Sequence, residues 1–337
     1  MTQSESNTTR DSVESIPVGR FVGSSEKADV VIIAVTYRNE ADVDGLLTSL
    51  RSEASAHRLR VIVADNDSPD DTLGRARAHA DVIAVHTGGN LGYAGGINAA
   101  MAFAGEADAV LVLNPDLVVN PGAIAALRER LTQPGVGIVV PLILDGTGDD
   151  TISLRREPSV LRSFGDALFG SRLRRRPGYL SELVLAPDAY AVAHPIDWAT
   201  GAALLISSEA ASAIGTWDEQ FFLYSEETDY FRRARDAGYA TWFEPTAIVR
   251  HSEGGSGASL ALEQLLAVNR IRYFAKHHGR LTTTLFHGTA VLNEITRCSD
   301  PRHRAILRTV ATPRSWRSLP HAQKSTGGPD HDGGGPR

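Results

Sequence analysis

The stretch DAVLVLNPDLVVNPGAI, residues 108–124, carries the strongest indication of the fold. Its four apolar residues 110–113 are typical of a buried strand, and the run ends abruptly in Asn114, Pro115 and Asp116. Pro115 has a fixed φ and restricts Asn114 to extended backbone, so the Asp116 carboxylate is held with little freedom. The sequence therefore predicts a core strand with an aspartate at its carboxyl end.

Apolar runs alternate with helical patterns on the amino-terminal side of this strand. Strands are expected at residues 29–37, 59–67, 81–88 and 109–116, and helices at 41–54, 69–79 and 97–106. Strands that are apolar on both faces and separated by helices indicate a parallel sheet covered on each side. Ligands of such sheets bind beyond the carboxyl ends of the strands. The polar residues that follow the four strands should therefore share one site.

Composition excludes several classes of protein. The net charge of −6 does not suit a nucleic-acid partner, which usually requires a basic domain. The single cysteine, Cys298, excludes an internal disulfide and a four-cysteine zinc site. No stretch approaches the roughly 18–20 apolar residues of a membrane span, and the polar N-terminus lacks the order of a secretory signal. A cytoplasmic location is expected, with or without association with the inner face of the membrane.

Two aspartates at predicted strand ends are candidates for a ligand site. Asp116 is interpreted either as a turn or helix-capping residue or as a ligand of Mg²⁺ or Mn²⁺, which prefer carboxylate and phosphate oxygens. Asp65, in VIVADNDSPDD, is interpreted either as a turn residue or as an acceptor for the imide N–H of uracil or thymine. Spacing alone does not decide between these interpretations.

Residues 88–100, GGNLGYAGGINAA, contain enough glycine for a backbone to approach phosphate closely at the start of a helix. The stretch does not match G-x-G-x-x-G in register, and no acid follows about 20 residues later at a strand end. A dinucleotide-dependent dehydrogenase is therefore disfavoured.

An acidic cluster in YSEETDYFRR offers candidates for a general base. On a helix, Glu226 and Asp229 share a face and Glu227 points elsewhere. Neighbouring acids raise one another's pKa, which suits a general base, although acids at a helix N-terminus are also favoured by the macrodipole alone. His251 follows a predicted strand, where a structural role competes with that of a ligand.

Taken together, these motifs resemble the inverting family 2 glycosyltransferases of the GT-A fold, especially the rhamnosyltransferase-like branch. The resemblance covers residues 30 to about 275 in the family's order, through VVIIAVTYRNE, VIVADNDSPD, GGNLGYAGGINAA, LVLNPDLVV, DWATGAALLI, DEQFFLYSEETDYFRRARDAGY and VRHSEGGS. It implies an α/β fold with a mostly parallel, Rossmann-like sheet flanked by helices. The implied divisions are a disordered tail (1–27), a nucleotide-sugar-binding half (28–145), an acceptor-binding and catalytic half (146–280), a C-terminal helical extension (281–320) and a second disordered tail (321–337).

The resemblance also implies roles for individual residues. The donor would be bound by Thr36, Tyr37, Asp65, Gly95, Gly96, Asn98 and Asn114, and the acceptor by Trp198, Thr200 and Gly201. Asn114-Pro115-Asp116 occupies the place of the family's D-x-D motif, with Asn114 replacing the first acid. Asp116 and His251 would be ligands of Mg²⁺ or Mn²⁺. Glu226-Glu227 matches a Glu-Asp pair whose second member is the usual base, so Glu227 is the first candidate, with Glu226 and Asp229 as alternatives.

The expected reaction is inverting transfer of a hexose, with L-rhamnose favoured, from a dTDP- or UDP-linked donor to a hydroxyl of a glycan or lipid-linked saccharide in cell-surface polysaccharide synthesis. The sequence SRLRRRP (171–177) is a candidate for contact with anionic headgroups or a solvated loop, and a homo-oligomer is left open. Two alternatives remain. One is a sugar-nucleotide pyrophosphorylase, which should carry a more basic first loop than VTYRNEADVDG; the other is a binding protein without catalytic activity.

Overall fold

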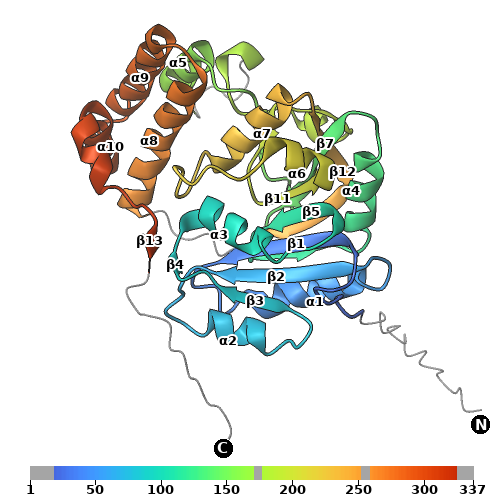
Figure 1. Cartoon of the computed structure of the whole chain (residues 1–337). Helices are drawn as coiled ribbons and strands as arrows, with labels where there is room; N and C mark the ends of the chain where they lie inside the picture. The colour runs from blue at the N-terminus through green and yellow to red at the C-terminus, as the bar shows by residue number, and fades with distance from the viewer. Residues whose placement is uncertain (1–18, 171–176, 252–258, 325–337) are drawn as a thin grey trace, which may run out of the picture.

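The computed structural model describes residues 19–170, 177–251 and 259–324, which include one nine-stranded mixed sheet (Figure 1). Its strand order is β3-β2-β1-β5-β11-β7-β12-β6, with β9 added beside β12. The strands are β1 (Ala28–Thr36), β2 (Leu59–Asp65), β3 (Ile83–His86), β5 (Ala107–Leu113), β6 (Leu117–Val119), β7 (Val136–Leu144), β9 (His194–Pro195), β11 (Ala203–Ser207) and β12 (Ala240–His251). Two short pairs lie outside it: β8 (Leu154–Arg155) with β10 (Trp198–Ala199), and β4 (Gly89–Asn90) with β13 (Gln323–Lys324).

The expected parallel arrangement holds for the first four strands, β3, β2, β1 and β5. The rest of the sheet is mixed, because β11 runs antiparallel between β5 and β7, and β6 and β9 run antiparallel to β12. In register, Thr36 lies opposite Asp65 and Ala34 lies opposite Leu113. The carboxyl ends of β1, β2 and β5 therefore meet at one edge, as the sequence predicted.

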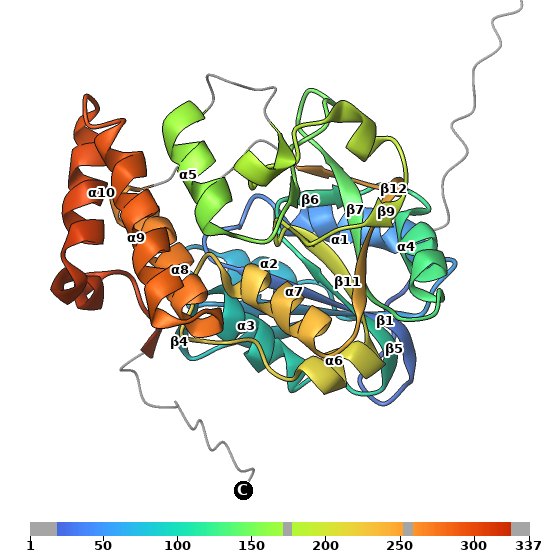
Figure 2. The same ribbon diagram turned by 90° about the horizontal axis from the view of Figure 1, so that it is seen from above.

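Helices cover both faces of the sheet (Figures 1 and 2). Alternate residues of β1 point to opposite faces: Ile32 packs in the cluster with α1 and α4, and Ile33 in the cluster with α3, α6 and α7. The helix bounds are α1 (Val43–Glu53), α2 (Thr72–Arg77), α3 (Gly92–Met101), α4 (Ala123–Leu131), α5 (Val160–Phe169), α6 (Ser208–Ile214) and α7 (Glu226–Asp236).

Three C-terminal helices form a layer beside the sheet domain: α8 (Leu260–His277), α9 (Arg280–Ile295) and α10 (Pro301–Ala311). They enclose an apolar cluster of their own, which includes Phe274, Phe286 and Val310. Helix α5 packs against α9. This helical layer therefore contacts the second half of the sheet domain through α5, and it includes α8, which the sequence analysis assigned to the catalytic half. In the described part of the chain, no helix is long and apolar enough to cross a membrane.

Three predicted boundaries differ from the structure. Residues 19–27 are not a tail, because Phe21 is buried and stacks against Arg51. Residues 321–324 are not a tail either, because they include β13. Helix α3 begins at Gly92 rather than residue 97, so most of the glycine-rich stretch is helical. Residues 1–18, 325–337 and 171–176 of SRLRRRP lie outside the described residues.

Candidate active site

The ends of β1 and β2 are joined by hydrogen bonds between side chains. The Thr36 hydroxyl donates to Asp65 Oδ1 at 3.0 Å, and the backbone N–H and hydroxyl of Ser68 donate to the same carboxylate at 2.9 and 2.5 Å. The Asp65 carboxylate therefore holds the turn that contains Ser68 and has a defined orientation at the end of β2. Tyr37 follows Thr36 and is exposed, and it lines a cavity at this edge.

Asp116 lies beside His251 because of the pairing between β6 and β12. His251 is opposite Leu117 in that pair, and its Nε2 is 3.4 Å from Asp116 Oδ2. Burial raises the pKa of Asp116, and the neighbouring His251 opposes that shift. The Asn114 N–H donates to the carbonyl of Ala202 at 2.8 Å, which ties this turn to the loop before β11. In the described ranges, no group of three His, Cys, Asp or Glu side chains could hold a metal.

A turn of left-handed backbone leads into α7. Tyr224 and Ser225 have φ of 70° and 72°, a conformation that costs free energy for residues other than glycine. The buried side chain of Asn269 on α8 donates to the carbonyls of Leu223 and Tyr224, at 2.9 and 3.2 Å. Helix α8 therefore holds the turn that sets where the acidic cluster begins.

The three acids at the start of α7 have different surroundings. Glu226 and Asp229 are buried on one face, as the helical spacing predicted, whereas Glu227 lines a cavity. One buried carboxylate oxygen of Glu226 and one of Glu227 have no hydrogen-bond partner among the described residues. Burial, followed by the charge of Glu227, raises the pKa of Glu226. Burial raises the pKa of Glu227 to about 6.

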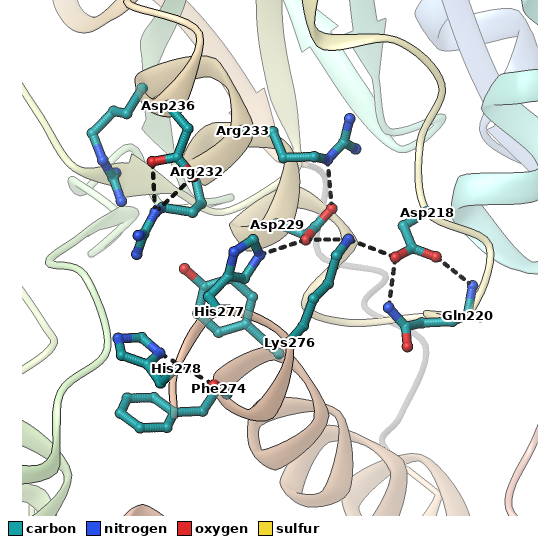
Figure 3. Close-up of polar contacts among 12 residues, drawn as sticks. Asp218, Gln220, Asp229, Arg232, Arg233, Asp236, Phe274, Lys276, His277 and His278 are labelled. Atoms are coloured by element: carbon teal, nitrogen blue, oxygen red, sulfur yellow. Dashed lines mark hydrogen bonds and ion pairs between the residues drawn. The ribbon is translucent and has the colours of Figure 1, made fainter. Parts of the chain in front are cut away.

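The Asp229 carboxylate contacts three basic side chains, as Figure 3 shows. Its carboxylate lies 2.8 Å from Arg233 Nε, 2.7 Å from Lys276 Nζ and 2.8 Å from His277 Nε2. Although burial opposes ionisation, hydrogen bonds from His277, Lys276 and Arg233 hold the pKa of Asp229 at about 2. These contacts give Asp229 a structural function, the anchoring of α7 to α8, and argue against it as the base.

The cavity beside Glu227 has a volume of about 750 Å³. Two of the three predicted acceptor residues, Trp198 and Thr200, line it. Its other lining residues include basic side chains and apolar side chains: Arg155, Arg270 and Arg297, and Leu183, Leu185 and Leu266. Asp65 and Asp116 are not among the lining residues, so the cavity opens on the Glu227 side of the site.

Gly201 and Tyr93 lie between the strand ends that carry Asp116 and the cavity beside Glu227. A Cβ at Gly201 would lie 3.3 Å from Glu227 Cβ, so the glycine leaves room for the Glu227 side chain. The Tyr93 hydroxyl donates to the Gly201 carbonyl at 3.1 Å. The pKa of Tyr93 is raised by burial and then by the carboxylates of Glu226, Glu227 and Asp116. Tyr93 therefore lies close enough to Asp116 and to the two glutamates of α7 for the charges of all three to affect it. The sequence alone did not identify Tyr93 as a site residue, and its position within the glycine-rich stretch was the one available signal.

The remaining predicted donor residues make structural contacts. A Cβ at Gly96 would lie 2.5 Å from Val35 Cγ1, so Gly96 allows α3 to pack closely on β1. Gly95 is also buried on α3. The Asn98 side chain donates to the Trp217 carbonyl at 2.9 Å and accepts from the Trp217 N–H at 3.0 Å. Gly96 and Asn98 therefore have structural contacts within the protein, and a role of the three residues in donor binding stays a prediction.

The curled mixed sheet flanked by helices has the architecture of the GT-A fold. Solved structures agree on the fold. A mannosyltransferase from Pyrobaculum calidifontis, in complex with GDP-Man and Mn²⁺, matches with a TM-score of 0.51 at 17% identity, over 91% of this chain and 87% of that one. GalNAc-T7 with UDP, GalNAc and Mn²⁺ matches with a TM-score of 0.50 at 14% identity, over 74% and 50%.

The model of glycosyl transferase family 2 matches residues 31–189. The chain is 32% identical over 257 residues to an N-acetylglucosaminyl-diphospho-decaprenol L-rhamnosyltransferase of Mycobacterium tuberculosis, which covers 72% of this chain and 82% of that protein. It is 31% identical to a hexosyltransferase of low-salt glycan biosynthesis from Haloferax volcanii, over 61% and 62%. The protein belongs to glycosyltransferase family 2, and its predicted activity as a glycosyltransferase of rhamnosyltransferase-like type is confirmed.

Proposed function

We propose that this enzyme transfers L-rhamnose, with inversion, from a dTDP- or UDP-linked donor to a hydroxyl of a lipid-linked saccharide, and that Glu227 is the general base. The observation that carries the proposal is the position of Glu227. Its carboxylate faces the cavity lined by Trp198 and Thr200, and burial raises its pKa to about 6. A base with a pKa near the working pH combines a useful ionised fraction with sufficient basicity.

The donor would bind at the strand edge that holds Thr36, Tyr37, Asp65 and Asn114. Hydrogen bonds with Thr36 and Ser68 orient the Asp65 carboxylate. An oriented carboxylate can accept the imide N–H that uracil and thymine share, which leaves both nucleotides as donors. The exposed ring of Tyr37 is available to pack against the base.

Asp116 and His251 fit a divalent cation, Mg²⁺ or Mn²⁺. Their nearest side-chain atoms are 3.4 Å apart, and the remaining coordination positions would be filled by donor phosphate oxygens, as is usual for such sites. When bound, the cation supplies charge neutralisation to the departing diphosphate. Glu227 removes the proton from the acceptor hydroxyl, and the resulting oxygen attacks the anomeric carbon on the face opposite the diphosphate.

The cavity lining supports a lipid-diphosphate-linked saccharide as the acceptor. Arg155 and Arg297 provide guanidinium groups that can pair with phosphate, whereas Arg270 is already paired with the Glu182 carboxylate; three leucines provide an apolar wall. The relative from Mycobacterium tuberculosis is named for an N-acetylglucosaminyl-diphospho-decaprenol acceptor. Both observations favour the same chemical class of acceptor.

The test is a transfer assay with dTDP-rhamnose and UDP-sugars, each with Mg²⁺ or Mn²⁺, and a short-chain polyprenyl-diphospho-N-acetylglucosamine as the acceptor. We expect acceptor-dependent release of nucleoside diphosphate, and a disaccharide product of inverted anomeric configuration. Donor binding without release above background, in the presence of the acceptor, would instead support a binding protein without catalytic activity. Formation of nucleotide sugar from nucleoside triphosphate would support a pyrophosphorylase.

We further propose that α5 rests on the membrane that holds the acceptor, at its inner face. Leu161, Phe164 and Leu168 lie on one face of α5 and are 51%, 42% and 43% exposed. The same helix contributes Asp166 to the wall of the acceptor cavity, and Gly170 follows at its end. An apolar surface continuous with this cavity suits an acceptor whose lipid stays in the bilayer.

Polar substitution of this face should weaken binding to vesicles. We expect Phe164→Ser to lower the partition coefficient onto phosphatidylglycerol vesicles about five- to tenfold, since about 1 kcal/mol of apolar burial is lost. The matched control is Phe103→Ser, because Phe103 follows α3 and is 47% exposed. Sedimentation with vesicles measures the effect. Equal losses for the two variants, or none for Phe164→Ser, would contradict the proposed membrane face.

A further inference from the structure

The C-terminal segment Pro320–Lys324 runs from the helical layer back to the sheet domain, at the edge where β1 and β2 end and where the donor is proposed to bind. Residues 323 and 324 form β13, which pairs antiparallel with β4 of the glycine-rich stretch: Gln323 lies opposite Asn90, and Lys324 opposite Gly89. Figure 1 shows β13 beside β4, below α8 and α10. Residues more than 230 positions apart in sequence are thus joined at this edge.

Contacts immediately before the segment hold it in place. The 3-10 helix η3 (Pro313–Ser318) follows α10, and its Trp316 indole N–H donates to the Thr309 carbonyl at 2.9 Å. Arg272 on α8 donates to the Trp316 carbonyl at 3.2 Å. Leu319 is buried in a cluster with Leu265 and Val268 of α8. The segment therefore leaves the helical layer from a fixed point.

The segment and the strand edge enclose a cavity of about 580 Å³. One wall is formed by Tyr37, Asp67, Asn90 and Phe222, and the other by the segment itself, through Pro320, His321, Gln323 and Lys324. Tyr37 directly follows Thr36, and Asp67 lies two residues after Asp65. The cavity is therefore at the strand ends where the donor nucleoside is proposed to bind.

The charges of the lining indicate what the segment supplies. Without the segment, Asp67 is the one charged side chain among the described lining residues, and it lies 3.1 Å from His86. An anionic nucleotide would be disfavoured beside this carboxylate alone. Lys324 adds an exposed ammonium group that forms no ion pair with any described residue, and His321 adds an imidazole. The segment thus converts an acidic pocket into one that can accept an anion.

We propose that Pro320–Lys324 forms the outer wall of the donor nucleotide site and that Lys324 contacts the phosphates of the bound nucleoside diphosphate. This inference rests on the proposed function, because it places the donor at the ends of β1 and β2. It adds to that function a contribution of the C-terminal helical layer to donor binding. The layer then shapes both substrate sites, since α8 also lines the acceptor cavity through Leu266 and Arg270.

The experiment compares the binding of UDP, dTDP and uridine to the full-length protein by calorimetry, with Mn²⁺ present. We expect Lys324→Gln to weaken UDP and dTDP binding about tenfold and to leave uridine binding unchanged, because one charge-assisted contact to phosphate is lost. His321→Ala should weaken the binding of all three ligands. The matched control is Lys27→Gln: Lys27 is likewise exposed, but it pairs with Asp108 at the opposite edge of the sheet, so nucleotide affinity should not change.

Three results would overturn the inference. If the wild-type protein binds UDP or dTDP and Lys324→Gln binds them within twofold of it, the segment is not part of the donor site. If Lys324→Gln or His321→Ala binds nucleotide more tightly, the segment occupies the site rather than completing it. If the wild-type protein binds neither nucleotide, the proposed function fails first, and this inference fails with it.

Discussion

Replacing Glu227 with glutamine is expected to lower the rate of sugar transfer by about 10²–10⁴-fold while leaving the affinity for donor nucleotide unchanged. Glutamine keeps the size of the side chain but cannot take the proton of the acceptor hydroxyl. Donor binding should survive, because Glu227 lines the acceptor cavity, whose lining does not include Thr36 or Asp65. Single-turnover transfer and calorimetry with UDP or dTDP measure the two effects separately.

The neighbouring acid supplies a matched control. Burial and the charge of Glu227 raise the pKa of Glu226, so its carboxyl group is favoured in the neutral form, which glutamine imitates. Glu226→Gln should therefore retain most of the activity. The opposite pattern, an active Glu227→Gln and an inactive Glu226→Gln, would move the base to Glu226.

The pH dependence of the wild-type enzyme is a second readout of the same assignment. Burial raises the pKa of Glu227 to about 6, so the carboxylate is ionised and able to act as a base above this pH. Below it, kcat/KM should fall about tenfold per pH unit as Glu227 becomes protonated. The residual activity of Glu227→Gln should not show this decrease of kcat/KM at low pH. If the variant still shows the decrease, another group is responsible for it.

Replacing Asp116 with alanine is expected to lower transfer about 10³-fold. Stabilisation of charge on the departing diphosphate by a divalent cation is worth several kcal/mol, and each 1.36 kcal/mol corresponds to a tenfold change in rate. Asp116 is the carboxylate at the predicted metal position, with His251 as its neighbour at 3.4 Å. Activity measured over a range of Mn²⁺ concentrations, together with Mn²⁺ binding in the presence of UDP, tests the prediction.

Two further variants separate a metal ligand from a structural acid. Asp116→Asn keeps the shape of the side chain but removes its charge, so it should also lose Mn²⁺ binding. His251→Ala should have a smaller effect and raise the Mn²⁺ concentration needed for half-maximal rate. An Asp116→Asn enzyme with unchanged rate and unchanged Mn²⁺ dependence would show that Asp116 acts only in the turn.

Local periodicity was sufficient for the first half of the fold. Buried parallel strands are apolar on both faces, so β1, β2 and β5 could be recognised from short apolar runs. The antiparallel direction of β11 could not be predicted in this way, because the direction of a strand depends on partners that are distant in sequence. The helix was expected to begin only at residue 97, because glycine is permissive in both loops and helices; in the structure α3 begins at Gly92, and Gly96 lets it pack closely on Val35.

The sequence by itself determined which residue types are available at the site: aspartates after apolar strands, an acidic cluster at a helix start, and motifs of the family in order. Helical spacing already separated Glu227 from Glu226 and Asp229, but only the tertiary structure showed which of these acids faces a cavity and which is paired with basic side chains. One helical turn presents Glu226 and Asp229 inward and Glu227 to the cavity. The basic side chains that contact Asp229 are Arg233 and two residues of α8, Lys276 and His277, which lie 47 and 48 residues further along the chain. The sequence gives the functional group of each side chain, but the charge state and accessibility of that group depend on neighbours that folding brings from elsewhere in the chain.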